Sequence, residues 1–370
     1  MCQHKSRSGV IWNEPVHRQG PPCHEKHWRY LMSQTRRSIF VVLLVTLALL
    51  LAACGAQTPA APPATSATTA PAAAEAPAQT PRITIKLAEN PWTGSSVNVH
   101  VAKLLLEEQL GYTVEVLTVD ENAQWAALAS GDLSATLEIW PSGHAENVQQ
   151  YIVDQQLVED LGPIGVVGKI GWYLPTYMVE QHPEMATYEG FRDAEIAALF
   201  STAETGTAGQ FLGGDPSWVQ YDEDIIKNLG LNLQVVQSGS EQAVLASLDS
   251  AYSRNEPILF YFWTPHSVHA KYDLTPVELP AYTDACYAQA DAGGVACAYP
   301  EDVLFKAAWA GLKEQAPDAY AMLSNMRYSN EDQIAMIAAV EIDGQEPEDA
   351  ARTWVEANEA AWRTWLPTGQ

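Results

Sequence analysis

The pattern of apolar and polar residues downstream of Arg82 predicts short strands that alternate with helices. Residues 83–87 alternate as a strand does, and the run after Ser95 and Ser96 has helical spacing as far as Leu110, where Gly111 ends it. The same reading predicts further strands at 112–117, 135–139, 195–201, 232–236 and 257–263, and further helices at 122–129, 218–229 and 241–252. Strands and helices that alternate through short connections are typical of an α/β fold with parallel strands.

The C-terminal part of the chain has a different pattern. From residue 301 onward the spacing is mainly helical, and Pro317 and Pro347 occupy positions that are typical of helix starts. With 370 residues and 47% apolar content, the chain can bury one large core or two moderate ones.

The N-terminal part predicts export. An apolar run at 39–53 follows Arg36 and Arg37, and it is too short to span a hydrocarbon core of about 30 Å but suits a signal peptide. The run ends in Leu51-Ala52-Ala53-Cys54-Gly55, which looks like a bacterial lipobox. We therefore expect a lipoprotein signal peptide at 32–53 and lipidation of Cys54, with Sec and Tat export both left open.

Two further N-terminal segments flank the signal. Residues 1–31 are interpreted as an extension from a misassigned start codon, because Met32 provides a normal start for the signal peptide. Residues 54–81 are rich in Ala, Pro, Thr and Ser, a composition that cannot bury enough apolar surface to fold. This segment is expected to be a tether between the lipid anchor and the folded part.

Charge and motifs exclude several classes of function. The formal net charge is −25, and seven of the 20 Lys and Arg residues precede Arg82, so the folded part is strongly acidic and is not expected to bind nucleic acid. The sequence has no nucleotide-binding glycine fingerprint, phosphate loop, nucleophile elbow or metalloprotease motif. We therefore expect neither an enzyme nor a protein with a cofactor.

Cysteine positions predict one disulfide. Cys2 and Cys23 lie upstream of the signal and Cys54 ends it, which leaves Cys286 and Cys297 as a pair in the folded part of an exported protein. Two buried free thiols are the alternative.

Three of the 12 tryptophans lie where a ligand is a natural partner. Trp140 and Trp263 each end a predicted strand, and Trp218 opens a predicted helix after a Gly-Pro loop. The carboxyl ends of strands in α/β sheets face the ligand crevice. A quaternary ammonium group has no N–H to donate, so a protein holds it with the negative faces of aromatic rings. Each tryptophan taken alone is more often a core aromatic, and the position of all three at element ends beside Gly and Pro loops favours the ligand site.

Groups for a ligand carboxylate occur beside these tryptophans. The amides of Val219 and Gln220 would be free donors in the first turn of the predicted helix, and His144 lies in the loop just after Trp140. An exposed loop histidine is the alternative for His144. Trp92 follows the first strand and is a candidate for a fourth aromatic wall.

Six short segments together resemble a known family: Leu110-Gly111-Tyr112, Ala129-Ser130-Gly131-Asp132, Trp140 to His144, Asp215-Pro216-Ser217-Trp218, Trp263-Thr264-Pro265-His266 and Tyr299-Pro300-Glu301-Asp302. From about residue 83 to 366 the chain resembles the substrate-binding proteins of glycine betaine/proline betaine ABC importers.

The resemblance implies a two-lobed fold of the periplasmic-binding-protein type (type II), with the ligand in the cleft between the lobes. Lobe one is expected to combine residues 82–168 with 302–370, and lobe two to comprise 169–301. The protein would then be an extracytoplasmic receptor on the outer face of the cytoplasmic membrane, with permease and ATPase subunits as partners.

The same resemblance assigns the tryptophan cage to Trp140, Trp218 and Trp263, and the carboxylate site to His144 with the Val219 and Gln220 amides. Some relatives brace the Trp218 loop with a disulfide, whereas Gly213 and Gln220 stand at those positions here. The loop is therefore expected to be less rigid, and the Cys286–Cys297 pair belongs to another loop.

Three alternatives stay open. Choline, carnitine or proline betaine can occupy an aromatic cage as glycine betaine does, although the predicted carboxylate site favours betaine over choline, and choline over glycine. A metal-binding receptor rests on His266 and His269 together with His144 or His182, which is a weak zinc signal without Cys or carboxylate ligands beside it. An enzyme is the third alternative.

Overall fold

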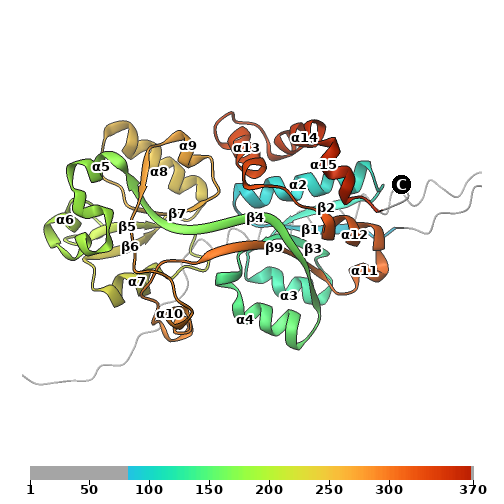
Figure 1. The fold of residues 1–370 in the computed structure, drawn as a ribbon, viewed down its shortest axis with the longest axis horizontal. Helices are drawn as coiled ribbons and strands as arrows, with labels where there is room; N and C mark the ends of the chain where they lie inside the picture. The colour runs from blue at the N-terminus through green and yellow to red at the C-terminus, as the bar shows by residue number, and fades with distance from the viewer. Residues whose placement is uncertain (1–81, 368–370) are drawn as a thin grey trace, which may run out of the picture. The chain divides into compact units, whose positions relative to one another are not determined.

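A nine-stranded mixed sheet is the framework of the structure, a computed structural model that describes residues 82–367 (Figure 1). The strand order is β2-β1-β3-β9-β4-β7-β5-β6, and β8 pairs with β4 at the side of this path. The strands are β1 (Ile85–Glu89), β2 (Val114–Thr118), β3 (Ala135–Ile139), β4 (Val158–Pro175), β5 (Gly209–Gly213), β6 (Leu233–Gln237), β7 (Phe260–Thr264), β8 (Leu274–Pro276) and β9 (Glu301–Trp309).

Helices cover both faces of this sheet. They are α2 (Thr93–Glu108), α3 (Ala123–Ser130), α4 (Ala145–Asn147), α5 (Thr176–Gln181), α6 (Ala194–Ala198), α7 (Asp222–Leu229), α8 (Glu241–Arg254), α9 (Val268–Lys271), α10 (Asp284–Tyr287), α11 (Leu312–Gln315), α12 (Pro317–Asn325), α13 (Asn330–Glu341), α14 (Pro347–Ala357) and α15 (Glu359–Trp362). A π-helix, Val148–Asp154, continues α4, and short 3₁₀ turns lie at Pro141–Gly143, Pro183–Ala186, Tyr188–Arg192, Ala290–Ala292 and Arg363–Trp365.

The sheet has two parallel halves that β4 and β9 join. In the β1–β3 half, β1 pairs in parallel with β2 and β3; in the β5–β7 half, β5 pairs in parallel with β6 and β7. The long strand β4 runs antiparallel to β9 and then to β7, so it extends from one half into the other (Figure 1). All these elements lie in one structural unit of the chain.

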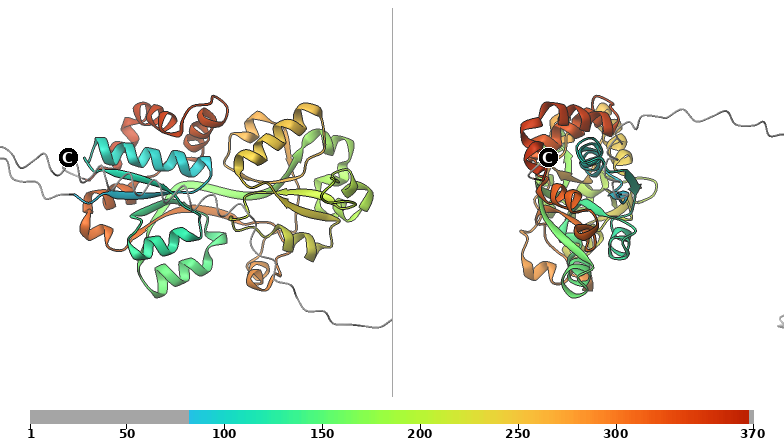
Figure 2. Two further views of the ribbon diagram at one scale, coloured as in Figure 1. Left: turned by 180° about the vertical axis from the view of Figure 1, so that it is seen from behind. Right: turned by 90° about the vertical axis from the view of Figure 1, so that its right-hand side faces the viewer.

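Each half has its own hydrophobic core. In the β1–β3 half, α2, α12, α13 and α14 bury apolar side chains on one face of the sheet, and α3 with the π-helix buries a smaller cluster around Trp125 on the other (Figure 2). The core of the β5–β7 half gathers Phe211, Phe260 and Phe262 with apolar residues of α7 and α8. Each half is therefore a layer of strands packed between helices, because parallel strands need cover on both faces.

The predictions for several elements are confirmed. The strand predicted at 135–139 is β3, and the helix predicted at 241–252 is α8, whose N-cap Ser240 accepts a hydrogen bond from the Ala243 amide. Pro317 and Pro347 start α12 and α14 as predicted. The three helices have local signals, a cap in α8 and a proline at the start of α12 and α14, that tertiary contacts do not override.

The strand predicted at 195–201 is wrong. This segment contains the short helix α6, because the Asp193 side chain caps it by accepting a hydrogen bond from the Glu195 amide at 2.8 Å. The neighbouring strand of the sheet is instead β5, which starts at Gly209. An apolar run of this length does not distinguish a strand from a helix, and the cap decides the outcome.

The helix predicted to start at Trp218 starts at Asp222. The Trp218 amide donates to the Asp215 carbonyl at 3.0 Å, and the Ser217 amide donates to the Asp215 side chain at 2.8 Å, so this segment is a tight turn. The amides of Val219 and Gln220 therefore precede α7, and the prediction that they lie in the first turn of the helix is wrong. Likewise α2 begins at Thr93, ahead of Ser95 and Ser96, after which the helical run was predicted.

Four strands were not predicted: β4, β5, β8 and β9. β4 contains several glycines and a proline, which the sequence pattern assigned to loops, and its pairing with β9 shifts register beside them. β9 lies at the start of the segment predicted to be helical. Its buried face carries Asp302, Leu304 and Lys306, and the two charged residues on this face hide the apolar alternation that is typical of a strand. Burial lowers the pKa of Lys306 to about 7, and its ammonium donates to the Met326 carbonyl at 2.6 Å.

Within residues 82–367, no helix combines the length and the apolar character needed to cross a membrane. The predicted signal peptide, Cys54 and the tether lie outside the described residues. In the same range, no group of three or more His, Cys, Asp or Glu residues is arranged to hold a metal ion.

Candidate solute-binding site

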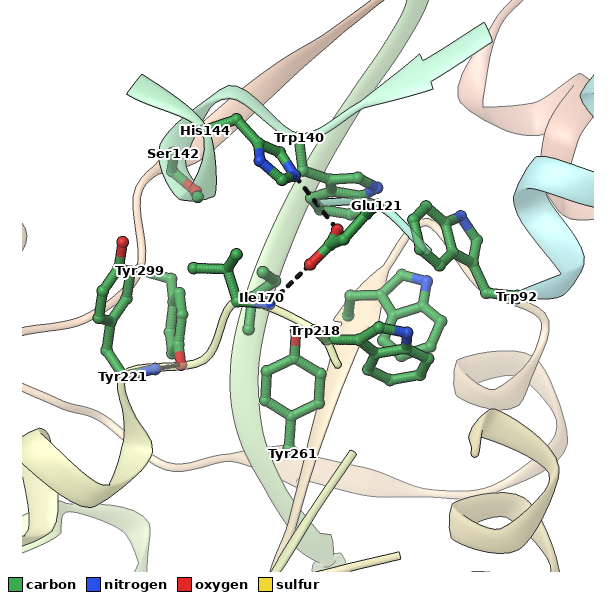
Figure 3. Close-up of a pocket in the computed structure, with 13 residues that line it drawn as sticks. Trp92, Glu121, Trp140, Ser142, His144, Ile170, Trp218, Tyr221, Tyr261 and Tyr299 are labelled. Atoms are coloured by element: carbon green, nitrogen blue, oxygen red, sulfur yellow. Dashed lines mark hydrogen bonds and ion pairs between the residues drawn. The ribbon is translucent and has the colours of Figure 1, made fainter. Parts of the chain in front are cut away.

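A pocket lies where the two halves of the sheet meet, and aromatic residues dominate its walls (Figure 3). The β1–β3 half contributes residues from the loops that follow β1, β2 and β3, and the β5–β7 half contributes the turn before α7 together with β7. The pocket is lined by Trp92, Glu121, Trp140, Ser142, Gly143, His144, Ile170, Trp218, Val219, Tyr221, Tyr261, Trp263 and Tyr299.

Four indoles form one side of the pocket, and we call Trp92, Trp140, Trp218 and Trp263 the indole wall. The rings of Trp92 and Trp218 meet edge to face, with centroids 6.1 Å apart at 87°. Trp218 and Trp263 meet at 5.3 Å and 84°. Rings set nearly at right angles present their faces to a common space from different directions, which is the arrangement that surrounds a rounded cation.

A buried carboxyl group orients two of these indoles. Oε1 of Glu138 accepts hydrogen bonds from Nε1 of Trp92 at 2.8 Å and Nε1 of Trp140 at 3.1 Å. Its Oε2 accepts from the amides of Asn98 at 2.5 Å and Gln333 at 2.9 Å. Burial raises the pKa of Glu138 to about 7, against the opposing effect of the indole and amide donors.

Close packing fixes the other two indoles. A Cβ atom on Gly214 would lie 2.5 Å from Cε3 of Trp218, so only glycine lets the backbone pass behind this ring. Trp263 stacks on Phe262 with centroids 4.3 Å apart at 7°, and its carbonyl contacts Nε2 of His269 at 2.9 Å. The indole wall is thus held by contacts that do not involve a ligand.

The polar side of the pocket is a carboxylate corner, which we define as Glu121, His144 and Val219. Oε1 of Glu121 accepts a hydrogen bond from the Val219 amide at 2.6 Å, and its Oε2 lies 3.3 Å from Nε2 of His144 (Figure 3). His144 is buried, and its Nδ1 contacts the Asn147 amide at 3.2 Å. Two of the three groups predicted to bind a ligand carboxylate, His144 and the Val219 amide, therefore contact the carboxylate of Glu121.

Local structure places Glu121 in this corner. It lies in the loop between β2 and α3, where Oδ1 of Asp120 accepts hydrogen bonds from the amides of Asn122 at 2.8 Å and Ala123 at 3.1 Å. The Asn122 side chain donates to the Ser217 carbonyl at 3.0 Å. The loop of the β1–β3 half is therefore tied to the turn of the β5–β7 half by Glu121 and by the adjacent Asn122.

Three tyrosines complete the pocket, and sequence reasoning gave them no role. The Tyr221 amide donates to the Tyr299 hydroxyl at 2.8 Å, and this hydroxyl donates to Oδ1 of Asp222 at 3.1 Å. Burial raises the pKa of Tyr261 and of Tyr299 well above the usual value, so both hydroxyls stay protonated. Tyr261 precedes Trp263 by two residues on β7, a spacing that places both side chains on one face of the strand.

The structure brings together most of the residues predicted for the site. Trp92, Trp140, Trp218, Trp263, His144 and Val219 all line the pocket. Gln220 does not line it: Oε1 of its side chain accepts from the Gly214 amide at 2.9 Å, and its Nε2 donates to the Asp215 carbonyl at 2.7 Å. Its side-chain amide thus links Gln220 to both Gly214 and Asp215 within the loop.

Glu121 and Glu138 were not predicted. Glu138 lies in β3, just before Trp140. A carboxyl group among the apolar residues of a buried strand was the signal that could have identified it. Glu121 had no such signal, because its role depends on a contact with a segment 98 residues away.

Residues assigned to other roles lie outside the pocket lining. A disulfide links Cys286 and Cys297, whose Cα atoms are 6.6 Å apart. His266 is buried with Nε2 3.0 Å from Oε1 of Glu241, and His269 contacts the Trp263 carbonyl. His266 therefore contacts a residue of α8, and His269 contacts a residue of β7.

Comparisons with known proteins show the family and the fold of the chain. The family model described as the substrate-binding domain of ABC-type glycine betaine transport systems matches residues 83–357. A trimethylamine N-oxide-binding protein of Pelagibacter ubique is 27% identical over 75% of this chain and 89% of its own length. The glycine betaine/proline betaine-binding periplasmic protein of Salmonella typhimurium is 27% identical over 44% of this chain and 49% of its own length.

Solved structures share the fold. A glycine betaine, L-proline-binding protein from Borrelia burgdorferi has a TM-score of 0.63 at 22% identity, covering 77% of this chain and 97% of its own. A lactococcal protein in complex with glycine betaine has a TM-score of 0.59 at 20% identity, covering 77% and 99%. The chain therefore belongs to the family of substrate-binding domains of ABC-type glycine betaine transport systems, and its fold is of the periplasmic-binding-protein type.

Proposed function

We propose that the protein is the solute receptor of an ABC importer and that it binds a small quaternary or fully methylated ammonium compound of the glycine betaine class. The observation that carries the proposal is the indole wall, in which four tryptophans line one pocket. Family membership supports the transport role, because substrate-binding domains of this family deliver their solutes to membrane permeases.

The chemistry of the wall favours a methylated cation over an ordinary amine. A primary ammonium group is strongly hydrated and needs hydrogen-bond acceptors when it is buried, whereas a trimethylammonium group needs only aromatic faces. Each desolvated cation–π contact contributes about 0.5–2 kcal/mol, so three or four contacts in a preformed cage are enough for micromolar affinity.

Trimethylamine N-oxide is a second candidate ligand within the same class. It carries the same three methyl groups around a quaternary nitrogen, and the relative named as its binding protein matches over 89% of its length. The glycine betaine/proline betaine-binding relative matches over 49% of its length. Both compounds therefore belong in a binding panel with choline and glycine.

We further propose that the two halves are lobes that close over the ligand. Lobe one would comprise residues 82–168 and 302–370, and lobe two 169–301, with the hinge where the chain passes between them near Gly168 and Glu301. The two cores support this division, since each half buries mainly its own apolar residues, and Trp92 and Trp140 at the pocket are the residues of the β1–β3 half that also pack with the core of the other half.

Contacts across the pocket support a closed arrangement of these lobes. Glu121 accepts from the Val219 amide, and the Thr93 amide donates to Oε2 of Glu241 at 2.8 Å. Each contact joins the β1–β3 half to the β5–β7 half. A ligand that contacts both lobes binds the closed form better than an open one, so it shifts the protein toward the closed form.

Isothermal titration calorimetry of the purified protein with glycine betaine, choline, trimethylamine N-oxide and glycine tests the ligand class. The methylated compounds should bind with micromolar affinity, and glycine should not bind measurably. Trp218→Leu should weaken the best ligand at least tenfold, because leucine fills space without an aromatic face. Trp309→Leu, outside the pocket, is the matched control. Glycine binding as tightly as the methylated compounds would refute the proposal, as would a Trp218→Leu variant that binds like the parent.

We also propose that Cys54 carries a lipid that holds the receptor on the outer face of the cytoplasmic membrane, with residues 54–81 as the tether. The lipobox sequence supports this proposal. Replacing Cys54 with Ser should abolish labelling by a fatty-acid analogue and release the protein from the membrane fraction. Membrane retention and labelling of the Cys54→Ser variant would contradict it.

We propose no catalytic activity for the chain. The family consists of transport receptors, and the pocket is lined mainly by aromatic side chains. Mass spectrometry of a bound methylated ligand after prolonged incubation should recover it unchanged, whereas a demethylated or cleaved product would establish an enzyme.

A further inference from the structure

Glu121 is the acidic residue among the thirteen residues drawn around the pocket (Figure 3). Its side chain is 8% exposed, and each of its two oxygens is engaged. The Val219 amide donates to Oε1 at 2.6 Å, and Nε2 of His144 lies 3.3 Å from Oε2. These are the donors that a betaine carboxylate would need, so the protein's own carboxylate occupies the position predicted for the carboxylate of the ligand.

We propose that Glu121 is a built-in counter-ion that selects against ligands with a carboxylate of their own. On this proposal, which rests on the proposed binding of methylated ammonium compounds, the receptor prefers a cation such as choline over zwitterionic glycine betaine. The two compounds carry the same trimethylammonium group and differ at the other end, where one has a hydroxymethyl group and the other a carboxylate. Glu121 would distinguish the two compounds by the group at that end.

Charge and hydrogen bonding both favour this preference. A betaine carboxylate would meet the carboxylate of Glu121 in a buried site of low effective dielectric, where like charges repel strongly. It would also find the Val219 amide and His144 already engaged. A choline hydroxyl brings a donor, and each oxygen of Glu121 has a further lone pair to accept it. The positive charge of choline, with no anion of its own, is attracted to the same carboxylate.

The position of Glu121 is fixed by the surrounding loop. Asp120 caps the turn that carries it, and the Asn122 side chain ties the next residue to the Ser217 carbonyl. The loop is therefore attached to the β5–β7 half by two adjacent residues. A betaine that displaced the Glu121 side chain would have to break the contact with Val219 that helps to hold the halves together.

The test compares choline and glycine betaine by calorimetry on the purified wild type, on Glu121→Gln and on Glu121→Ala. The wild type should bind choline at least tenfold more tightly than glycine betaine. Glu121→Ala frees the Val219 amide and His144, so it should bind glycine betaine more tightly and choline more weakly, shifting the affinity ratio at least tenfold toward betaine. Glu121→Gln keeps the shape without the charge and should shift the ratio in the same direction.

Different outcomes separate the two proposals. A wild type that prefers glycine betaine overturns the role of Glu121 and leaves the proposed function standing, as does a ratio that changes less than twofold in both variants. A wild type that binds trimethylamine N-oxide but neither of these two compounds overturns the role of Glu121 in preferring choline and leaves the proposed function standing. A wild type that binds none of the three overturns the proposed function itself. Thermal unfolding of each variant shows whether it is folded, and should the Ala variant be unfolded, the Gln variant decides the outcome.

Discussion

The indole wall and the carboxylate corner differ in how they are held. Trp92 and Trp140 are fixed by Glu138 within the β1–β3 half, and Trp218 and Trp263 are packed within the β5–β7 half. The carboxylate corner depends on a contact between the halves, because Glu121 and Val219 come from opposite sides of the pocket. The groups proposed to bind the cation are thus fixed within each half, whereas the contacts of the charge at the other end of the pocket need both halves.

This difference divides affinity from selectivity. Contacts that are already in place cost no ordering when a ligand binds, so the indole wall should supply most of the affinity. A contact that depends on closure can change which ligand favours the closed form. Variants in the wall should therefore weaken all methylated ligands together, and variants in the corner should change their order.

The largest effect is expected from Glu138→Leu, which removes the acceptor shared by Trp92 and Trp140. Hydrogen bonds to a charged group contribute about 1.5–3 kcal/mol each, and without them the two indoles lose their fixed orientation. Affinity for choline and for glycine betaine should fall by about 10- to 100-fold, with their ratio unchanged. Calorimetry measures both constants.

Glu138→Gln is the conservative control for this prediction. The glutamine oxygen can still accept from both indoles, and the neighbouring amides of Asn98 and Gln333 can reorient toward its N–H₂ group. Affinity should therefore fall less than in Glu138→Leu. Equal losses in the two variants would mean that the charge of Glu138, and not its acceptor, supports the site.

Glu138 should also make stability depend on pH. Burial raises its pKa to about 7 in the folded protein, from 4.5 when unperturbed. Between these values the folded state holds a proton that the unfolded state has lost, so the free energy of unfolding falls as the pH rises from about 4.5 to about 7. The contribution is fully present below this window. Urea unfolding at pH 5 and pH 8 should show a smaller pH effect in Glu138→Gln than in the wild type.

A moderate effect is expected from Gly214→Ala. The added Cβ would lie 2.5 Å from Cε3 and 2.6 Å from Cζ3 of Trp218, so the indole must move into the pocket. All methylated ligands should bind about 3- to 10-fold more weakly, again without a change in their order. Gly171→Ala is the matched control, because its Cβ meets the Tyr173 side chain at 3.2 Å and no residue of the indole wall. Equal losses in the two variants would contradict the packing argument.

The sequence predicts the indole wall well because its signals are local. Trp140 and Trp263 lie beside the ends of β3 and β7, where the geometry of parallel strands brings side chains to one edge of the sheet. Even with the start of α7 misplaced by four residues, Trp218 lies in the pocket, since the turn before the helix points to the same space. Local patterns therefore suffice wherever strand ends position the residue.

The carboxylate corner could not be predicted in the same way. His144 and Val219 were identified as donors, but the group that they bind comes from the β2–α3 loop, 98 residues before Val219 in sequence. No period or motif relates these segments. β4 and β9 escaped prediction for a similar reason, since their strand pairing outweighs glycine, proline and charged residues that locally favour loops or helices.

The smallest effect is expected from Asn122→Ala, which tests whether the corner depends on the contact between the halves. The Asn122 side chain donates one hydrogen bond to the Ser217 carbonyl at 3.0 Å at an exposed position, so its loss should cost about 0.5–1 kcal/mol. Because this bond ties the loop of Glu121 to the turn of Val219, the choline-to-betaine affinity ratio should move about twofold toward betaine, in the direction of Glu121→Ala. Asn228→Ala is the control, since its side chain amide donates to Gly293 and Val295 away from the pocket. A ratio that stays constant in Asn122→Ala while both affinities fall would show that this contact stabilises closure for every ligand alike, and the division between affinity and selectivity would then have to be drawn at Glu121 alone.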